Sequence, residues 1–243
     1  MIVTITVNPA IDKSTSFQKL IPEKKMRCSE MTIEAGGGGI NVSKVLKELG
    51  GESIAVFPSG GANGKLLEQT LSNSNIPFNA IPIENETREN FTATELLTNA
   101  QYRFVMPGAS LNIQELNKCF NVIKDIHPNP NFIVFSGSLA PGMADSVVAQ
   151  FAVIAKELNA KFIVDTSGEP LKKAVEEGAF LVKPNLSELC FLVEKEFLEL
   201  SEVDNAAKSI IEKGHTEVIV VSMGPSGALL VTKDLCKRVP API

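Results

Sequence analysis

The sequence has 243 residues, is 44% hydrophobic, and carries 23 basic against 28 acidic residues for a formal net charge of -5. A chain of this kind buries a sizeable core, as one large α/β domain or two small ones. The acidic balance, without a basic stripe, argues against nucleic acid as a partner. No apolar run approaches the ~18 residues of a membrane span, and the opening Met-Ile-Val-Thr-Ile has no basic leader region, so we expect a cytoplasmic protein with no membrane partner.

Short β-branched apolar runs recur along the chain and predict buried parallel strands. They span Ile2 to Val7, Ser53 to Phe57, Phe132 to Phe135, Lys161 to Val164, Phe180 to Val182 and Val218 to Val221. Helical patterns alternate with them, at residues 42–49 (closed by Gly50 and Gly51), 143–158, 171–177 and 202–214. The alternation predicts a doubly wound, mostly parallel sheet with helices on both faces, whose ligands lie beyond the carboxyl ends of the strands.

Two stretches, 14–35 and 87–106, break this rhythm. They contain alternating segments at 91–96 and 101–105 that suit antiparallel strands with one covered face. We predict that they form a small β lid, while residues 1–13, 36–86 and 107–243 form the α/β core. Because an open sheet with an apolar face needs a cover, we also expect a homodimer through this lid.

Scattered cysteines and histidines predict neither disulfides nor a histidine-based site. The cysteines lack C-x-x-C spacing and disulfide-scaffold density, so we expect reduced thiols. The histidines are too few and too far apart for a His metal site or an obvious Ser-His-Asp triad. The residues concerned are Cys28, Cys119, Cys190, Cys236, His127 and His215.

Four glycines, Gly36 to Gly39, lead directly into an amphipathic helix through Ile40 and Asn41. Glycines at a helix N-terminus let backbone N–H groups approach an anion or a polar hydroxyl, which favours ligand contact over a merely flexible turn. The dinucleotide fingerprint fails because its third glycine is missing, which disfavours NAD. A second cluster, residues 59–66, fails the Walker template at both ends, so we expect a strand-to-helix turn there.

Polar residues also follow the predicted strands, where an open α/β sheet keeps its site. Each could be an ordinary turn, but together they favour a site for a phosphorylated ligand. These residues are Asn8 and Asp12, Ser136 to Ser138, Asp165 to Gly168, Lys183 to Glu188, and Ser222 to Gly227.

Five of these segments, in order, carry a family resemblance. They are Asn8-Pro9-Ala10-Ile11-Asp12, Gly-Gly-Gly-Gly-Ile-Asn at 36 to 41, Ser-Gly-Ser-Leu-Ala-Pro-Gly at 136 to 142, Lys-Pro-Asn-x-x-Glu at 183 to 188 and Ser-x-Gly-x-x-Gly at 222 to 227. The set resembles the ribokinase-like (PfkB) family of carbohydrate kinases through essentially the whole chain. Gly38 stands where the fructose-1-phosphate and tagatose-6-phosphate kinases of that family usually carry lysine. Residues 25–28 and 102–108 resemble its minor 6-phosphofructokinases, which favours fructose 6-phosphate, although tagatose 6-phosphate stays open.

The resemblance implies ATP as co-substrate, Mg²⁺ as cofactor, and a role for each matching residue. On the sugar side, it implies hydroxyl contacts from Asp12, Gly37, Gly38, Gly39 and Asn41, and phosphate-side contacts from Arg88, Arg103 and Ser138. The fork geometry of arginine suits such an anchor, although either arginine could instead be a solvated lid residue. On the nucleotide side, it implies Lys183, Asn185, Ser222, Gly224 and Gly227 in the ATP pocket, Asn185 and Glu188 orienting Mg²⁺ and its waters, and Lys25 reaching the transferred phosphate.

The family's late Gly-Ala-Gly-Asp motif, with its catalytic aspartate and anion hole, is absent from these 243 residues. We expect that aspartate beyond Ile243, in a longer parent 6-phosphofructokinase, and assign no base within the chain. Three alternatives stay open: a tagatose-6-phosphate or fructose-1-phosphate kinase, a non-catalytic short form that binds a sugar phosphate, or a structural protein with a β dimer clasp. Ligand-induced thermal stabilisation would exclude the last of these.

Overall fold

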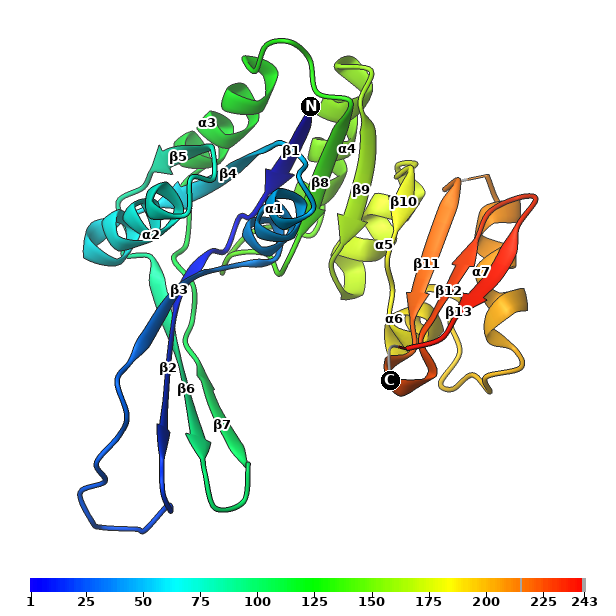
Figure 1. Ribbon diagram of the computed structural model, residues 1–243. Coiled ribbons are helices and arrows are strands. Elements are labelled where there is room, and N and C mark those ends of the chain that lie inside the picture. Colours follow the sequence, from blue (N-terminus) through cyan, green and yellow to red (C-terminus); the bar gives the residue numbers. More distant parts are fainter. Residues whose placement is uncertain (215, 242–243) are drawn as a thin grey trace.

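The computed structural model describes residues 1–214 and 216–241, so His215 lies outside the described residues. A mostly parallel sheet with helices on both faces forms the body, and a second, smaller sheet extends from it (Figure 1). The predicted α/β class is therefore confirmed. Among the described residues, no helix combines the length and apolar character that crossing a bilayer requires.

The main sheet has nine strands, and seven of them, from β11 to β5 in spatial order, run parallel. The last two, β12 and β13, are antiparallel additions at one edge. In spatial order the strands are β13 (Cys236–Val239), β12 (Ala228–Val231), β11 (Val218–Ser222), β10 (Leu181–Val182), β9 (Lys161–Asp165), β8 (Phe132–Ser136), β1 (Ile2–Ile5), β4 (Ser53–Ser59) and β5 (Phe78–Pro82).

Helices cover the two faces of this sheet unequally. One face packs a large apolar cluster against five helices, namely α3 (Ile113–Lys124), α4 (Val147–Glu157), α5 (Gly168–Glu176), α6 (Leu186–Leu192) and α7 (Val203–Glu212). The other face has α1 (Gly38–Glu48) and α2 (Gly61–Asn73), which enclose a smaller cluster around Phe57. Beside α1 this second face is bare: an apolar hollow of about 390 Å³ is lined by strand residues including Val134, Ile163 and Val220.

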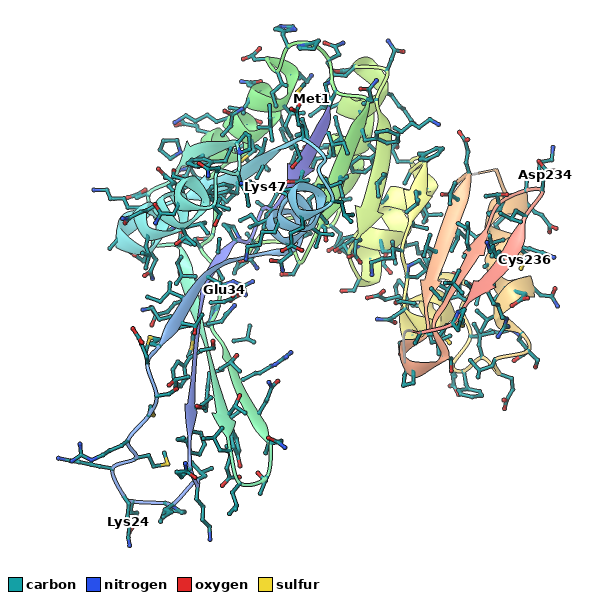
Figure 2. The ribbon with its side chains drawn as sticks, viewed as in Figure 1. Met1, Lys24, Glu34, Lys47, Asp234 and Cys236 are labelled. Atoms are coloured by element: carbon teal, nitrogen blue, oxygen red, sulfur yellow. The ribbon has the colours of Figure 1, made fainter. Side chains whose placement is uncertain are left out.

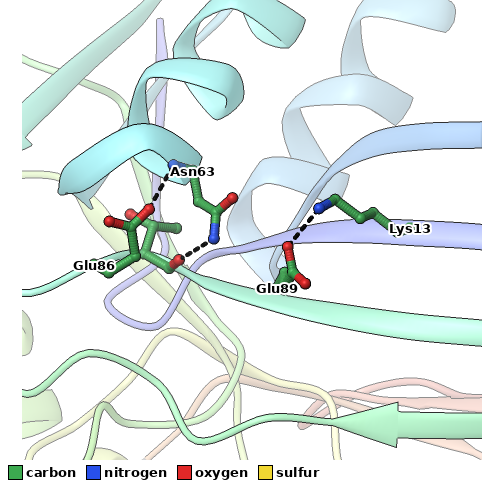
Figure 3. Close-up of polar contacts among 5 residues, drawn as sticks. Lys13, Asn63, Glu86 and Glu89 are labelled. Carbon is green, nitrogen blue, oxygen red and sulfur yellow. Dashed lines mark hydrogen bonds and ion pairs between the residues drawn. The ribbon is translucent and has the colours of Figure 1, made fainter.

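The second sheet, here called the lid sheet, has the order β3 (Thr32–Gly36), β2 (Ala10–Phe17), β6 (Arg88–Glu95) and β7 (Gln101–Val105). Its two faces differ because side chains alternate along each strand. Ile33, Lys13, Phe91 and Phe104 form one row of paired residues on one face, where Lys13 pairs with Glu89 (Figure 3), and Phe91 and Phe104 lie 6.2 Å apart between ring centroids. Asp12 and Arg103 lie on the opposite, polar face.

Most predicted elements are present, with shifts at their ends. The helix predicted at 143–158 begins only at Val147, because Pro141 and Gly142 introduce a turn in which Gly142 has a φ of 79°. The strand predicted at 180–182 is reduced to two residues. All four cysteines are free thiols; Cys119 and Cys190 are buried, and burial raises the pKa of the Cys119 thiol to about 12.

Candidate active site

The polar segments predicted after the strands lie along one edge of the main sheet. Strands β11, β10, β9, β8 and β1 are consecutive neighbours and parallel, so their carboxyl ends share that edge. The polar lid face joins the edge at the β1 end, because β2 starts five residues after β1 finishes. The edge therefore has a half near the lid, around β1 and β8, and a half around β10 and β11.

Asp12 lies on β2 with its carboxylate held across the lid sheet. Its Oδ1 accepts a hydrogen bond of 2.8 Å from the side-chain amide of Asn90, its register partner on β6. The carboxylate also occupies the space beside Gly36, where a Cβ would lie 2.2 Å from Oδ2. This arrangement fixes the rotamer of a half-buried acceptor at the base of the lid, as recognition of a sugar hydroxyl requires.

The glycine run lets α1 begin close against the sheet. Gly37 has a φ of 125°, a conformation that side chains rarely adopt. A Cβ on Gly38 would lie 2.5 Å from the carbonyl carbon of Ser136, and one on Gly39 would lie 2.5 Å from the backbone oxygen of Ile5. Packing therefore accounts for these glycines without a ligand, while their position at the N-terminus of α1 still points backbone N–H groups toward the edge. Asn41, one turn into α1, is exposed.

Ser138 and Arg88 converge near Asn8, the polar residue that follows β1. The amide of Asn8 donates to Ser138 Oγ at 3.1 Å and to the backbone oxygen of Leu139 at 3.0 Å. Arg88 donates to the backbone oxygens of Asn8 at 3.1 Å and Met106 at 3.2 Å. The side chain of Arg88 thus lies where lid and body meet, and two of its five donors are already used.

The two arginines have different surroundings. Burial lowers the pKa of the Arg88 guanidinium, and the nearby charge of Asp12 partly offsets that effect. Arg103 is exposed on β7 and donates to Gln101 at 3.2 Å. Register places both arginines on the polar lid face with Asp12 and Asn90.

The segment that leads into β6 is anchored on α2. Glu86 accepts a hydrogen bond of 2.7 Å from the backbone N–H of Asn63, and the Asn63 side chain donates to the backbone oxygen of Thr87 at 3.0 Å (Figure 3). Thr87 in turn accepts from the backbone N–H of Gly60 at 3.0 Å. The cluster at 59–66 is therefore a strand-to-helix turn, as predicted, and a carboxylate of the chain itself occupies the helix N-terminus. This anchor determines where Arg88 enters the lid.

On the other half of the edge, Lys183 follows β10 and pairs with Asp165 at the end of β9. Its Nζ lies 3.0 Å from Asp165 Oδ1, and Ser136 Oγ donates to Asp165 Oδ2 at 3.3 Å. The pair is partly exposed, so it contributes little to stability. The carboxylate of Asp165 therefore holds Lys183 at the side of this half that is nearer the lid.

Asn185 and Glu188 form a reciprocal capping box at the start of α6. Asn185 Oδ1 accepts from the Glu188 N–H at 2.9 Å, and Glu188 Oε2 accepts from the Asn185 N–H at 2.8 Å. Helix capping alone therefore accounts for their spacing. Their oxygens, with Asp165 on the neighbouring strand, are the hard donors that Mg²⁺ prefers, and Mg²⁺ usually keeps several waters. No group of three His, Cys, Asp or Glu side chains able to hold a metal occurs within 1–214 and 216–241.

The loop after β11 adjoins this capping box. Ser222 pairs with Asn185 in an isolated parallel bridge and donates its N–H to the backbone oxygen of Pro184 at 2.9 Å. Gly224 and Gly227 have φ values of 56° and 86°; Gly224 begins a turn of 3₁₀ helix and Gly227 is its C-cap. A Cβ on Gly227 would lie 2.0 Å from the backbone oxygen of Val239, so packing against β13 already requires this glycine.

Lys25 stands apart from the other predicted residues. It lies in an exposed turn of the lid between β2 and β3. Figure 2 places its neighbour Lys24 at the end of the lid farthest from the body, whereas Glu34 lies near the junction. In this conformation Lys25 is not beside the strand ends, and its contact with a transferred phosphate stays a prediction.

Sequence reasoning missed two side chains that organise the site. Asn90, which holds Asp12, stands in an alternating strand pattern that hides its role. Glu86, which anchors the entry to β6 on α2, looks like one of many surface acids. No local signal marks Glu86, because the helix N-terminus whose N–H it accepts lies 23 residues earlier in the sequence.

Comparison with known proteins gives a consistent result. Residues 1–243 match the pfkB family of carbohydrate kinases. The chain is 42% identical over 237 residues to ATP-dependent 6-phosphofructokinase isozyme 2 of Mycobacterium tuberculosis, covering 98% of this chain and 70% of that protein. It is 39% identical over 242 residues to the isozyme 2 of Escherichia coli, covering 99% and 78%. A 1-phosphofructokinase of Borreliella burgdorferi is 32% identical over 231 residues, covering 95% and 74%.

Two solved structures of Escherichia coli phosphofructokinase-2 superpose closely on the chain. The complex with fructose-6-phosphate has a TM-score of 0.93 and 39% identity, covering 99% of this chain and 80% of that one. The tetrameric inhibited form has a TM-score of 0.92 at the same identity, covering 99% and 79%. The doubly wound body and the small second sheet are therefore shared with these structures.

Proposed function

Because the chain belongs to the pfkB family of carbohydrate kinases, we propose that it serves ATP-dependent phosphorylation of fructose 6-phosphate at the 1-hydroxyl, giving fructose 1,6-bisphosphate. One observation supports this most: the predicted polar segments that follow the strands lie along one edge of the main sheet, next to the polar lid face, in a chain 42% identical to a 6-phosphofructokinase. Phosphoryl transfer depends mostly on positioning and electrostatic stabilisation, so two ligands bound along one edge suit it.

In the sugar half, Asp12 would accept hydrogen bonds from sugar hydroxyls, because Asn90 already fixes its carboxylate. Backbone N–H groups of Gly37 to Gly39 and the exposed amide of Asn41 would contact further hydroxyls. Ser138 and Arg88, which both meet Asn8, would bind the 6-phosphate from one side. Arg103, on the same lid face, would approach it from the lid.

In the nucleotide half, Lys183, Asn185, Ser222, Gly224 and Gly227 would line the ATP site. Bound Mg²⁺ would neutralise phosphate charge, and Asn185 and Glu188 would hold it through water. Lys183, paired with Asp165 at 3.0 Å, would turn to the phosphates when ATP binds. Lys25 would reach the transferred group only if the lid closed over the edge.

A kinase assay tests this proposal directly. The purified chain, with its intact mass measured, is given fructose 6-phosphate and Mg-ATP, and ADP release is followed. We assign no catalytic base within the 243 residues, so we expect binding of both ligands with little turnover unless further sequence supplies the aspartate. Rapid turnover at 26.1 kDa would contradict that assignment, and absence of ligand-induced thermal stabilisation would contradict the function.

Related substrates form the second candidate, because a 1-phosphofructokinase is also among the relatives. Gly38 favours fructose 6-phosphate, because the fructose-1-phosphate and tagatose-6-phosphate kinases that the chain resembles usually carry lysine at this position. Parallel titrations with fructose 1-phosphate and tagatose 6-phosphate would decide between the sugars.

We further propose that 14–35 and 87–106 act as the lid and pair with a second copy. The apolar lid face supports this, since Ile33 is 41% and Phe104 51% exposed in one row. Such a face on an open sheet is unfavourable unless covered. Phe104→Asp should convert the dimer to a monomer, which light scattering would measure as a halved molar mass. A wild-type chain that is already monomeric would overturn the proposal.

A further inference from the structure

The junction between lid and body contains buried polar atoms that no other protein group satisfies. Within 1–214 and 216–241, two buried side-chain nitrogen or oxygen atoms lack any hydrogen-bond partner, Asn8 Oδ1 and Arg88 Nε. The two residues are bonded to each other, through the Arg88 guanidinium and the backbone oxygen of Asn8 at 3.1 Å. Because a buried polar atom without a protein partner is unfavourable unless water or a ligand satisfies it, these two adjacent residues are candidates for a role in ligand binding.

Asn8 is well placed to meet such a requirement. Its side chain is only 8% exposed, and Gly108 passes so close that a Cβ there would lie 2.0 Å from its Oδ1. Its two amide protons are both used, toward Ser138 Oγ and the backbone oxygen of Leu139. These contacts hold the Asn8 side chain in one orientation.

The bond to Ser138 determines what that hydroxyl can do. Since Oγ accepts a hydrogen bond from the Asn8 amide, the hydroxyl's own proton is not used in that contact. Ser138 is exposed, so this proton is available to a ligand at the edge. Arg88, tied to the Asn8 backbone, is held beside the same place. Asn8 thus contacts both the neutral donor, the Ser138 hydroxyl, and the cationic donor, the Arg88 guanidinium.

We infer that Asn8 is the positioning residue for the phosphate end of the sugar site. Its side-chain amide orients the Ser138 hydroxyl toward the 6-phosphate, while its backbone oxygen holds the Arg88 guanidinium beside the same place, and Asn8 does not itself act as a catalytic residue. This inference rests on the proposed binding of fructose 6-phosphate. We therefore expect that substitutions of the Asn8 side chain lower the affinity for fructose 6-phosphate and leave the affinity for ATP unchanged.

Calorimetric titration of the 243-residue chain tests it, with fructose 6-phosphate and ATP measured separately. Asn8→Ala should lower the affinity for fructose 6-phosphate about tenfold, the change expected from the loss of one hydrogen bond. Asn8→Asp keeps the size of the side chain but places a carboxylate beside Ser138, so its proton turns inward and the phosphate is repelled. The loss should then exceed that of Asn8→Ala, which also keeps the test valid if the alanine variant fails to fold.

The chain offers a matched control in Asn85, whose amide likewise donates to a serine hydroxyl and a backbone oxygen, both of Ser110. Asn85→Ala should leave both affinities unchanged. If Asn8→Ala lowers the affinities for ATP and fructose 6-phosphate equally, or changes neither affinity, the inference is wrong while the proposed function stands. If the wild-type chain binds no fructose 6-phosphate, the proposed function fails and the inference fails with it.

Discussion

The two halves of the site edge are built in different ways. In the sugar half, the key contacts join residues far apart in sequence: Asn90 holds Asp12 across 78 positions, and Asn8 holds Ser138 across 130. In the nucleotide half, Lys183 and Ser222 also contact distant segments, but Asn185 and Glu188 satisfy each other in a capping box over three positions.

This difference shows how far a motif can be interpreted. A capping box would be retained for helix stability alone, so its presence says little about a ligand. A carboxylate held by a distant amide at an open edge has no comparable local purpose. The sugar half therefore gives independent structural support for binding, whereas the nucleotide half depends more heavily on family membership.

The largest expected effect is the loss of stability caused by a substitution in the glycine run at 36–39. Gly38→Ala should lower the free energy of unfolding by about 2–3 kcal/mol, because its Cβ meets the Ser136 backbone at 2.5 Å. Chemical denaturation measures this. Gly142→Ala is the control: it has a positive φ but open space, so it should cost only about 1 kcal/mol. Equal losses would show that the close approach of α1 to β8 is not the reason for Gly38.

Asp12→Asn should have the second-largest effect, and it should lower only the affinity for the sugar phosphate. Loss of the charge removes charge-assisted hydrogen bonds to sugar hydroxyls, so affinity for fructose 6-phosphate should fall roughly ten- to hundredfold. Calorimetry measures it, with Glu34→Gln as control, since Glu34 is the exposed register partner of Asp12 on β3. A similar loss in the control would indicate a general charge effect.

Glu188→Gln separates capping from metal binding, because glutamine still completes a capping box but has no charge for Mg²⁺. Stability should be unchanged, while affinity for Mg-ATP should fall about tenfold if Glu188 holds the ion through water. Titrations with and without Mg²⁺ make the comparison. An unchanged Mg-ATP affinity would leave Glu188 with a structural role only.

Asn185→Ala should produce the smallest effect, a loss of about 1 kcal/mol in unfolding free energy from the missing cap. Asn185→Asp should restore it, because aspartate caps equally well. Thermal unfolding of the two variants provides the measurement. Failure of aspartate to rescue stability would mean that the capping box is not what Asn185 contributes to the fold.

Periodicity predicted the parallel sheet, its helices and the separate lid because burial patterns of strands and helices are local in sequence. The strand-end rule also brought the polar segments to one edge. What could not be predicted depends on register: nothing near Asn90 or Asn8 indicates which residue will face it. The capping role of Asn185 and Glu188 was readable from their spacing, yet the same spacing fits a metal site, so sequence alone could not separate the two.

The central claim is that one sheet edge binds two ligands through two separately built halves. Calorimetric titration of fructose 6-phosphate and Mg-ATP into Asp12→Asn and Glu188→Gln, side by side, tests it most directly. We predict that Asp12→Asn lowers the affinity for fructose 6-phosphate only, and that Glu188→Gln lowers the affinity for Mg-ATP only. Equal loss of both ligands in either variant, or of neither in Asp12→Asn, would contradict it.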